Sequence, residues 1–351
     1  MFNRFLGRFS EDIGIDLGTS NTRIFVKGKG LVMNEPSIVA FNTRTNQIIA
    51  VGSQARDMVG KTPPHIQTSR PLTKGVISDF EIAEKMLKYF IDKIHEESFT
   101  IVPRPRIVIG VPLEMTEVER KAVEDASKSA GARQVCLVEN VTAAAIGARL
   151  PMTESIGNMV VDIGGGNTEI AVISLSGVVT WKSLSIAGDE MTKAIIQYAR
   201  DVYNLFIGDR VADGVKCRIG SALDVTEVME LEMRGRDVVT GLPKQVLVSD
   251  AQIREALHRS VRSIVENIKL TLEATPPELV ADIYERGITL TGGGSLLRGF
   301  DKLISRETDI PVRIAEDPMT CTVRGTGALL DDEALLRDIT LPGTAEEPFM
   351  P

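Results

Sequence analysis

Two stretches of the chain are largely apolar runs that are followed, after a short turn, by a segment in which β-branched residues occupy every second position. The runs are residues 13–17 and 159–163, and Thr, Ile and Val then occupy every second position of 22–26 and again of 168–172. A period of two is typical of β-strands. Each stretch therefore predicts a β-hairpin with a glycine-bearing turn, and the chain contains the hairpin twice.

Segments between and after the hairpins have helical periodicity. The stripe in 79–97 predicts a helix, and a capping box at Thr116 and Glu119 predicts a second helix that ends near Gly131. Strands are expected at 107–111 and 135–138, with helix following at 143–148.

The second half repeats this alternation. We expect a helix at 189–203, weak strands within 227–248 and a long helix from Ser249 that Pro276 and Pro277 stop. A strand at 288–290 should then lead through glycines into a helix from residue 296. Strands that alternate with helices predict an α/β sheet covered on both faces.

The two hairpin turns share the motif D-[LI]-G-x-x-N-T, at 16–22 and 162–168. Glycine-rich turns let backbone N–H groups approach an anion, so two such turns facing each other could clamp a polyphosphate. Asp16 and Asp162 would hold the hydrated Mg²⁺ that accompanies it. The alternative is a pair of plain hairpins with Asp as turn former. Duplication favours the phosphate interpretation.

A third glycine turn, Gly292, Gly293 and Gly294, follows the strand at 288–290. A strand that enters a helix through glycines directs N–H groups at a ligand. Alone, the motif fits a tight turn equally well. Beside the two hairpins it becomes a candidate floor for adenosine.

Composition narrows the class of protein. The chain has 351 residues, 43% of them hydrophobic, and a net charge of −8, which suits two domains and argues against a general nucleic-acid surface. Three cysteines without CxxC spacing indicate a reducing compartment, and three scattered histidines give no support to a zinc or Ser-His-Asp hydrolase.

The N-terminus has an amphipathic pattern. Phe2, Phe5, Leu6 and Phe9 fall on one helical stripe, with arginines off it. This pattern predicts a short membrane-binding helix over residues 1–10 that lies in the lipid interface. The alternative is a frayed terminus or a helix docked on the body.

Several motifs together resemble the MreB family of bacterial cell-shape actins, within the actin-like ATPase superfamily. They are DLGTSNT at 16–22, NEPS at 34–37, GVISDF at 75–80, MVVDIGGG at 159–166, TPPEL at 275–279 and LTGGG at 290–294. The resemblance extends from residue 1 to about 330.

The resemblance implies an α/β fold with two lobes of duplicated ribonuclease-H-like domains around a nucleotide cleft, each lobe carrying a small insertion. Lobe I would be 11–145 with an insertion at about 31–75. Lobe II would be 146–330 with an insertion at about 181–247, and the chain would return to lobe I near 316–340. The tail at 341–351 is expected to be disordered.

The resemblance also implies cofactors and partners. These are ATP with Mg²⁺, other copies of the chain in paired filaments, and the inner face of the bacterial cytoplasmic membrane. RodZ, MreC, MreD and wall-elongation synthases would be the further partners of a cytoplasmic, membrane-peripheral filament.

Family roles transfer to matching positions. Asp16 and Asp162 would bracket the metal, and residues from both hairpin turns and the late glycine turn would bind the nucleotide. The nucleotide-binding set is Gly18, Thr19, Ser20, Asn21, Thr22, Gly164, Gly165, Gly166, Asn167, Asp213, Lys216, Gly292, Gly293 and Gly294. An apolar loop with Phe99, Ile101 and Val102 either contacts lipid or is buried.

Three departures from the family pattern concern the reaction. Asn140 stands where the family has a glutamate that polarises the attacking water, and Asn167 stands where it has a water-holding threonine. Asp213 and Gly214 replace Glu-Arg before Lys216. An amide orients water but cannot accept its proton. We therefore expect ATP binding and polymerisation with slow hydrolysis. The alternatives are a divergent paralogue that copolymerises with or regulates a main MreB, and a monomeric kinase or phosphatase.

Overall fold

The computed structural model describes residues 11–96 and 104–342. They form two compact units. Unit 1 contains the residues up to Glu154, Leu175–Gly177 and the residues from Thr320 onward, and unit 2 contains Ser155–Ser174 and Val178–Met319. The sequence placed the division near residue 145, whereas the helix Asn140–Gly147 packs wholly within unit 1.

Unit 1 is built on a five-stranded sheet in the order β10-β9-β1-β2-β3. Its strands are β1 (Ile13–Leu17), β2 (Asn21–Val26), β3 (Gly30–Pro36), β9 (Arg106–Val111) and β10 (Gln134–Glu139). β1 pairs antiparallel with β2, and β9 lies parallel to both β1 and β10. The first hairpin and the two later strands are therefore confirmed.

Unit 2 repeats this sheet, in the order β13-β12-β11-β17-β18. Its strands are β11 (Asn158–Ile163), β12 (Thr168–Ser174), β13 (Gly177–Leu184), β17 (Ile288–Thr291) and β18 (Val312–Ile314). β11 pairs antiparallel with β12 and parallel with β17, as β1 does with β2 and β9. The duplication read from one heptad thus extends to the strand order of a whole sheet.

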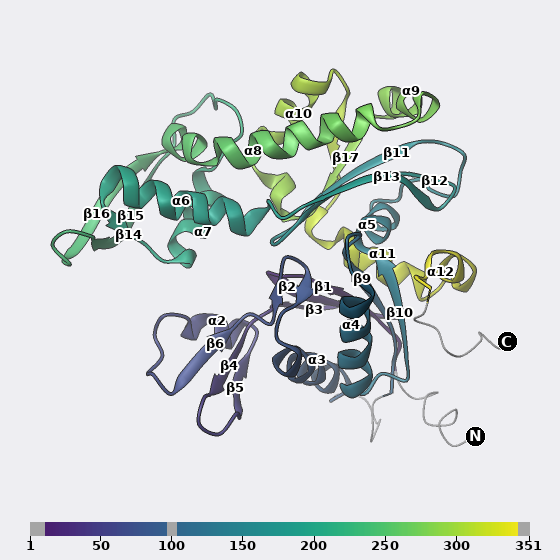
Figure 1. Ribbon diagram of the computed structural model, residues 1–351, viewed down its shortest axis with the longest axis horizontal. Coiled ribbons are helices and arrows are strands. Elements are labelled where there is room, and N and C mark those ends of the chain that lie inside the picture. Colours follow the sequence, from purple (N-terminus) through teal and green to yellow (C-terminus); the bar gives the residue numbers. More distant parts are fainter. Residues whose placement is uncertain (1–10, 97–103, 343–351) are drawn as a thin grey trace. The chain divides into compact units, whose positions relative to one another are not determined.

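Helices cover both faces of the first sheet. α3 (Phe80–His95) and α4 (Glu117–Ser129) lie side by side on one face (Figure 1). Ile82, Met86 and Phe90 of α3 are buried against Ile13 and Ile15 of the sheet. On the other face lie α5 (Asn140–Gly147) and α11 (Cys321–Leu329), which pack on each other, and α12 (Glu333–Ile339) follows α11.

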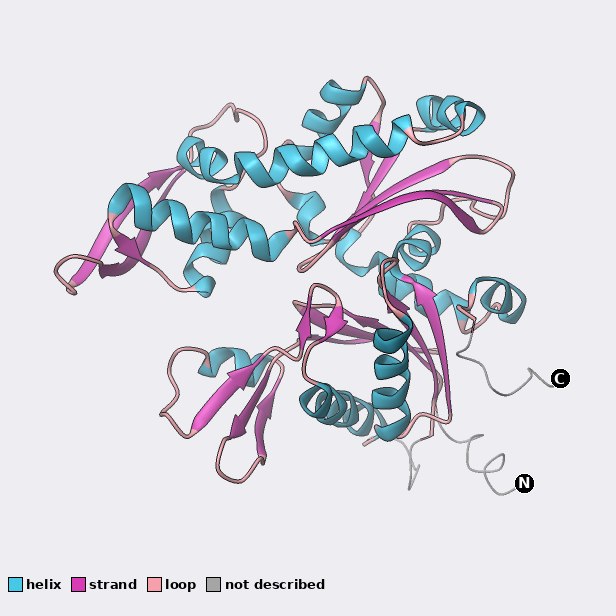
Figure 2. Ribbon diagram, viewed as in Figure 1, coloured by secondary structure: helices cyan, strands magenta, loops and turns pink. Residues whose placement is uncertain are grey.

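In unit 2 the long helix α8 (Asp250–Glu273) packs on β12 beside α6 (Gly188–Tyr203) and α7 (Asp209–Ile219) (Figure 2). Its stripe of Ile253, Leu257, Ile264 and Ile268 is fully buried. The capping boxes predicted before α4 and α8 are both present, with side chain and backbone bonded reciprocally. These sequence signals therefore mark where the two helices begin.

Each unit also carries a small sheet. In unit 1 it consists of β4 (Val39–Asn42), β5 (Ile48–Val51) and β6 (Ile66–Ser69), followed by β7 (Leu72–Thr73) and β8 (Val76–Ile77), with α2 (Ser53–Met58) between β5 and β6. In unit 2 it consists of β14 (Leu205–Phe206), β15 (Glu230–Asp237) and β16 (Pro243–Ser249). The insertion expected from residue 31 begins only after β3, because β3 pairs with β2 in the main sheet.

The long helix α8 ends at Glu273, before the two prolines, as predicted, and Pro277 also opens α9 (Pro277–Arg286) at the first position, where a missing N–H costs nothing. Two other local predictions were wrong. The glycines at 292–294 enter the 3₁₀ turn η2 (Gly293–Leu296), and the following helix α10 begins at Phe300 and ends at Thr308. Leu341, expected in a disordered tail, donates its amide to the carbonyl of Leu137 and packs on the core.

The last short element is η3 (Pro318–Thr320).

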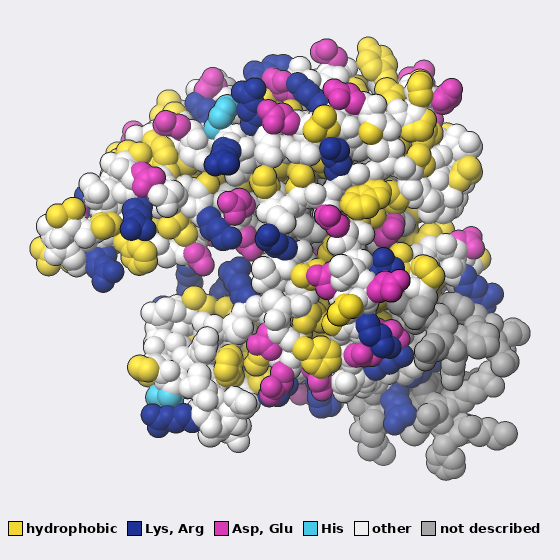
Figure 3. All heavy atoms as spheres, viewed as in Figure 1, with side chains coloured by type: hydrophobic (Ala, Val, Ile, Leu, Met, Phe, Trp, Pro, Cys, Tyr) yellow, Lys and Arg dark blue, Asp and Glu magenta, His cyan; other side chains and the backbone are white. Residues whose placement is uncertain are grey.

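The predicted membrane contacts Phe2, Phe5, Leu6 and Phe9 lie outside the described residues, as do Phe99, Ile101 and Val102. None of the helices in the described ranges combines the length and the apolar character that crossing a bilayer requires. Lys and Arg side chains intermingle with Asp and Glu side chains over the visible face of the molecule (Figure 3).

Candidate functional site

The first hairpin turn is closed by one backbone hydrogen bond. The amide of Gly18 donates to the carbonyl oxygen of Asn21 over 3.2 Å. A Cβ atom on Gly18 would lie 2.7 Å from that oxygen, which is shorter than the contacts that Cβ atoms make in proteins. Ser37 supports the turn from behind, because its hydroxyl donates to the Gly18 carbonyl and its amide donates to that of Ser20. The glycine is therefore required by the closeness of the turn.

Two threonines expected to line this turn hold it in place through their side chains. The Thr19 hydroxyl accepts the amide of Gly75 over 2.8 Å and is buried. The Thr22 hydroxyl is fully buried and lies 2.9 Å from that of Ser37. Thr19 lies in the turn and Thr22 lies in β2 just after it, and the hydroxyls of both are used within the protein. Contact with a ligand would fall to backbone groups and to partly exposed side chains.

The second hairpin turn has the same closure. Gly164 donates its amide to the carbonyl oxygen of Asn167 over 3.0 Å, and a Cβ atom on Gly164 would lie 3.1 Å from it. The start of α6 supports this turn. The amides of Gly188 and Asp189 donate to the carbonyls of Gly164 and Gly165 over 3.1 and 2.8 Å. The two motif copies thus fold into the same turn on different supports.

The two motif aspartates end equivalent strands but have different neighbours. The Asp16 carboxylate accepts a hydrogen bond from Arg23 over 3.0 Å. Burial raises the pKa of Asp16, and Arg23 opposes that rise. Asp162 instead accepts from the hydroxyl of Thr291 over 2.8 Å. A carboxylate therefore stands at each turn, beside a cation in unit 1 and hydrogen-bonded to a hydroxyl in unit 2.

Asn140 lies at the same edge of the unit 1 sheet as Asp16. Gly110 of β9 pairs with Asp16 of β1, and a Cβ atom on Gly110 would overlap the side-chain oxygen of Asn140. That oxygen is buried and has no hydrogen-bond partner within the described residues. Asn140 is also the first residue of α5. The amide oxygen therefore remains available to a ligand or a water.

Glu139, one residue earlier, has a different environment. Its carboxylate accepts a hydrogen bond from the hydroxyl of Thr142 over 2.9 Å. Burial raises its pKa, while Thr142 and Arg120 oppose the rise. Since this side chain bonds along α5 and that of Asn140 lies over Gly110, Glu139 does not replace the missing glutamate at position 140. The two side chains diverge because α5 begins between them, with Glu139 as the residue before its first turn.

The glycine turn at 292–294 packs beside the second hairpin. Gly292 has φ +76°, and its amide donates to the carbonyl of Pro318 over 2.9 Å. Cβ atoms on Gly292 and Gly294 would overlap Ile163, the residue just before the Gly164 turn. Two glycine turns of unit 2 therefore lie together. The helix-dipole argument does not apply here, because η2 is a single 3₁₀ turn.

Lys216 is linked through Gly188 to the second hairpin turn, because Gly188 bonds to the carbonyl of Gly164. Its ammonium lies 2.8 Å from the carbonyl of Gly188, the hydroxyl of Thr192 and the carboxylate of Asp213. An ammonium has three N–H donors, so these contacts occupy all of them. Asp213 and Lys216 thus form an ion pair one turn apart on α7. To bind a ligand directly, Lys216 would have to exchange one of these partners.

Comparison with known proteins decides the family. The family model described as MreB/Mbl protein matches residues 10–338. The chain belongs to the MreB/Mbl family. The cell shape-determining protein MreB of Escherichia coli strain K12 is 49% identical over 335 residues, which cover 94% of this chain and 96% of that protein.

Solved MreB structures share the fold. A crystal structure of MreB 5 of Spiroplasma citri bound to AMPPNP has a TM-score of 0.88 and 38% identity, and covers 92% of this chain and 97% of its own. A second structure of that protein, bound to ADP, has a TM-score of 0.88 and 37% identity, and covers 94% and 98%. The predicted actin-like α/β fold with two lobes is therefore confirmed.

The chemistry of these residues suits a nucleotide with Mg²⁺. Carboxylate oxygens are ligands that Mg²⁺ prefers, and it commonly keeps several waters and binds through one or two carboxylates. Within the described residues there is no group of three or more His, Cys, Asp or Glu side chains that could hold a metal by itself.

Sequence reasoning missed four supporting residues of this MreB/Mbl chain. Each of them contacts a turn residue or Asn140, and they are Ser37, Gly75, Gly110 and Gly188. Ser37 and Gly75 lie in motifs that carried the resemblance, NEPS and GVISDF, so a signal for these two was present. Gly110 and Gly188 stand at a strand end and a helix start, where only the packing shows why glycine is needed.

Proposed function

We propose that this chain binds ATP with Mg²⁺ through its two hairpin turns and polymerises into filaments of the MreB kind. The observation that carries the proposal is the repeated closure of the turns, Gly18 to Asn21 and Gly164 to Asn167. Turns built this closely on glycine leave backbone N–H groups accessible to an anion. Relatives bound to AMPPNP and to ADP support the nucleotide class.

The residues divide into roles by their chemistry. Asp16 and Asp162 would hold the hydrated metal, and backbone N–H groups of 18–20 and 164–166 would bind phosphate. Gly292, Gly293 and Gly294 would lie under adenosine, and Ile163 excludes side chains at the first and third of these positions. Lys216 and Asp213 would act near the ribose, with Lys216 exchanging one of its present contacts.

Filaments would associate with the inner face of the cytoplasmic membrane through residues 1–10. The stripe of Phe2, Phe5, Leu6 and Phe9 would enter the acyl boundary, with arginines among anionic headgroups. One such helix binds weakly, so polymerisation would add the affinities of many copies. RodZ, MreC, MreD and wall-elongation synthases are the partners that family membership suggests for determination of rod shape.

Hydrolysis would be slow, because both water-holding positions carry amides. The Asn140 oxygen can accept one hydrogen bond from a water but not its proton. Loss of a general base lowers rates by about 10²–10⁴-fold. The paired change also favours a second candidate function, a paralogue that copolymerises with or regulates a main MreB.

A sedimentation experiment tests the proposal. The full chain is mixed with vesicles of anionic phospholipid and ATP–Mg²⁺, and pelleting is compared with ADP, with no nucleotide, and with residues 1–10 deleted. We expect polymer to form only with nucleotide. We expect that polymer to pellet together with the vesicles only when residues 1–10 are present. A protein that stays in the supernatant under all conditions would indicate a monomeric enzyme of the superfamily and would contradict the filament proposal.

Phosphate release separates the two candidate functions. A polymer that forms alone with slow release supports the main proposal. A chain that pellets only when a second MreB with the intact glutamate and threonine is added supports the paralogue. Release as fast as that of the second protein would contradict slow hydrolysis.

A further inference from the structure

Arg23 stands directly across the β1–β2 hairpin from Asp16. The two residues are register partners, and the guanidinium Nη1 lies 3.0 Å from the carboxylate Oδ2. Both side chains are largely buried, at 15% and 14% exposed. Side chains directly opposite in an antiparallel pair lie on the same face of the sheet. Arg23 therefore points to the same side of the hairpin as the carboxylate assigned to the metal.

The second hairpin provides an internal comparison. There the residue across from Asp162 is Glu169, which is 1% exposed, and Asp162 accepts a hydrogen bond from the neutral Thr291. The repeat thus places an arginine against one motif aspartate and an acidic residue against the other. The two turns have the same backbone closure, so the charge of the residue opposite the motif aspartate, positive in unit 1 and negative in unit 2, distinguishes the first site from the second.

A guanidinium at this distance forms a charge-assisted hydrogen bond and offsets part of the negative charge of the largely buried carboxylate. Without the arginine, Asp16 would repel the phosphates of a nucleotide unless a metal lay between them. With the arginine, phosphate can approach the turn with less help from a metal. The fixed cation also repels a dication near Asp16 and competes with it for the carboxylate. Both effects act in the same direction.

We propose that Arg23 is a positioning residue that takes over part of the charge compensation of Mg²⁺ at Asp16, so that nucleotide binding depends unusually little on the metal. This inference rests on the proposed nucleotide function. The Nε atom of Arg23 is buried without a partner within the described residues. The guanidinium therefore has a donor that the described structure does not use.

The test compares nucleotide affinity with Mg²⁺ and with EDTA in four forms of the full chain. These are the wild type, Arg23→Met, Arg23→Lys and the control Arg44→Met, which changes an exposed arginine in a turn of the same unit. Binding of a fluorescent ADP analogue is measured by anisotropy, and circular dichroism confirms that each variant is folded. Methionine keeps the apolar stem and removes the charge, while lysine keeps the charge without the planar, forked set of N–H donors of the guanidinium.

We expect the ratio of Kd in EDTA to Kd in Mg²⁺ to rise about tenfold in Arg23→Met, a difference of about 1.4 kcal/mol, and to stay at the wild-type value in Arg44→Met. Arg23→Lys should give a ratio close to wild type. An unchanged ratio in folded Arg23→Met that still binds nucleotide would overturn the inference and leave the proposed function standing. A wild type that binds in neither condition would refute both.

Discussion

The amide of Gly164 donates to the carbonyl oxygen of Asn167 as the amide of Gly18 does to Asn21, over 3.0 and 3.2 Å. Two segments far apart in the sequence therefore close the same turn with the same pair of motif positions. The acceptor is a backbone oxygen in each turn, so the closure depends on the glycine and not on the asparagine side chain.

Replacing either glycine by alanine should weaken nucleotide binding. A Cβ atom at Gly18 would meet the Asn21 oxygen at 2.7 Å, so the turn must open. Overpacking of this kind costs about 1–3 kcal/mol. We expect a loss of affinity of about tenfold or more for Gly18→Ala and a smaller loss for Gly164→Ala, where the contact is 3.1 Å. Calorimetric titration with ADP measures both.

The control for these variants is Gly208→Ala. Nothing lies within 4 Å of a Cβ atom there, and φ is −89°. This change should leave affinity as in the wild type. Equal affinity in Gly18→Ala and Gly208→Ala would show that the turn does not contact the nucleotide.

The sequence predicted most of the fold because its signals are local. Strand alternation, the capping boxes and the heptad each depend on residues close together in the chain, and each was confirmed. Errors arose where tertiary contacts decide. The strand Gly30–Pro36 joins the main sheet only because β2 offers its edge, and Leu341 is ordered because Leu137 accepts its amide.

The sequence names the turn residues and carboxylates of the candidate site but not the residues that hold them in place. Motif residues reveal turns and carboxylates, whereas the partners that hold them lie elsewhere in the chain. Thr19 is bound by Gly75 and Lys216 by Gly188, at separations that no spacing rule covers. The Asp16–Arg23 contact follows from hairpin register alone, and it could have been read from the sequence.

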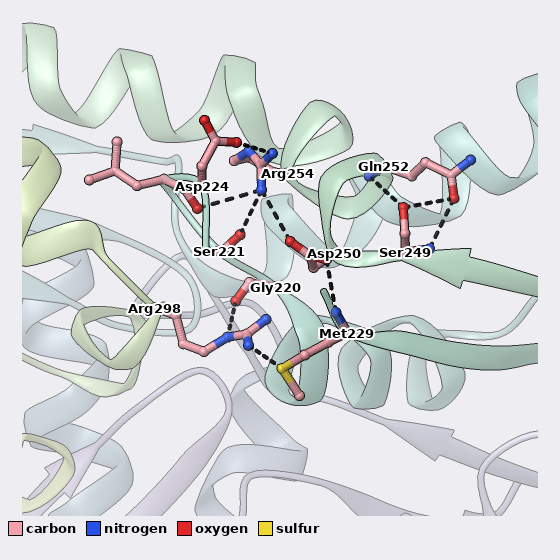
Figure 4. A network of polar contacts seen from close by, with 10 residues as sticks. Gly220, Ser221, Asp224, Met229, Ser249, Asp250, Gln252, Arg254 and Arg298 are labelled. Carbon is pink, nitrogen blue, oxygen red and sulfur yellow. Dashed lines mark hydrogen bonds and ion pairs between the residues drawn. The ribbon is translucent and has the colours of Figure 1, made fainter. Parts of the chain in front are cut away.

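Replacing Arg254 should destabilise the protein. Figure 4 shows this side chain on α8 between Asp250, Asp224 and Ser221. Asp250 is 4% exposed, and its carboxylate lies 3.3 Å from the guanidinium. Removing the cation leaves a buried charge with too few partners. We expect Arg254→Met to lower the free energy of unfolding by about 3 kcal/mol, measured by urea denaturation.

A matched change on the same helix controls for this prediction. Arg262 forms an exposed ion pair with Glu266 one turn away, at 3.0 Å. Exposed pairs contribute about 0–1 kcal/mol, so Arg262→Met should change stability little. Equal losses in the two variants would indicate that the contribution of Arg254 is not electrostatic.

Stability should depend on pH through Glu139. Burial raises the pKa of this carboxyl above its ordinary value of 4.5. The unfolded chain therefore loses the proton first as pH rises, which favours unfolding until the folded pKa is passed. Glu139→Gln removes this penalty. Its stability relative to wild type should increase between about pH 4 and neutral pH, as measured by thermal unfolding across that range.

The exposed Glu114 provides the comparison. A Glu114→Gln variant that reproduced the same pH-dependent gain would mean that a general change in net charge, and not burial of Glu139, is responsible. A gain for Glu139→Gln that is absent at low pH and present at neutral pH has the sign that the buried carboxyl requires.

The double change Asn140→Glu with Asn167→Thr should raise the rate of phosphate release. The Asn140 oxygen already lies where a Cβ atom on Gly110 would be, so the glycine is what admits a side chain from position 140. A carboxylate there can accept a proton from water, and we expect an increase of about 10²-fold or more. The closure of the second turn uses the backbone oxygen of Asn167, so Asn167→Thr should leave the turn closed. Asn140→Gln with Asn167→Thr has a longer amide that orients water but accepts no proton. If this variant releases phosphate as fast as the glutamate form, water orientation and not proton transfer is what the chain lacks.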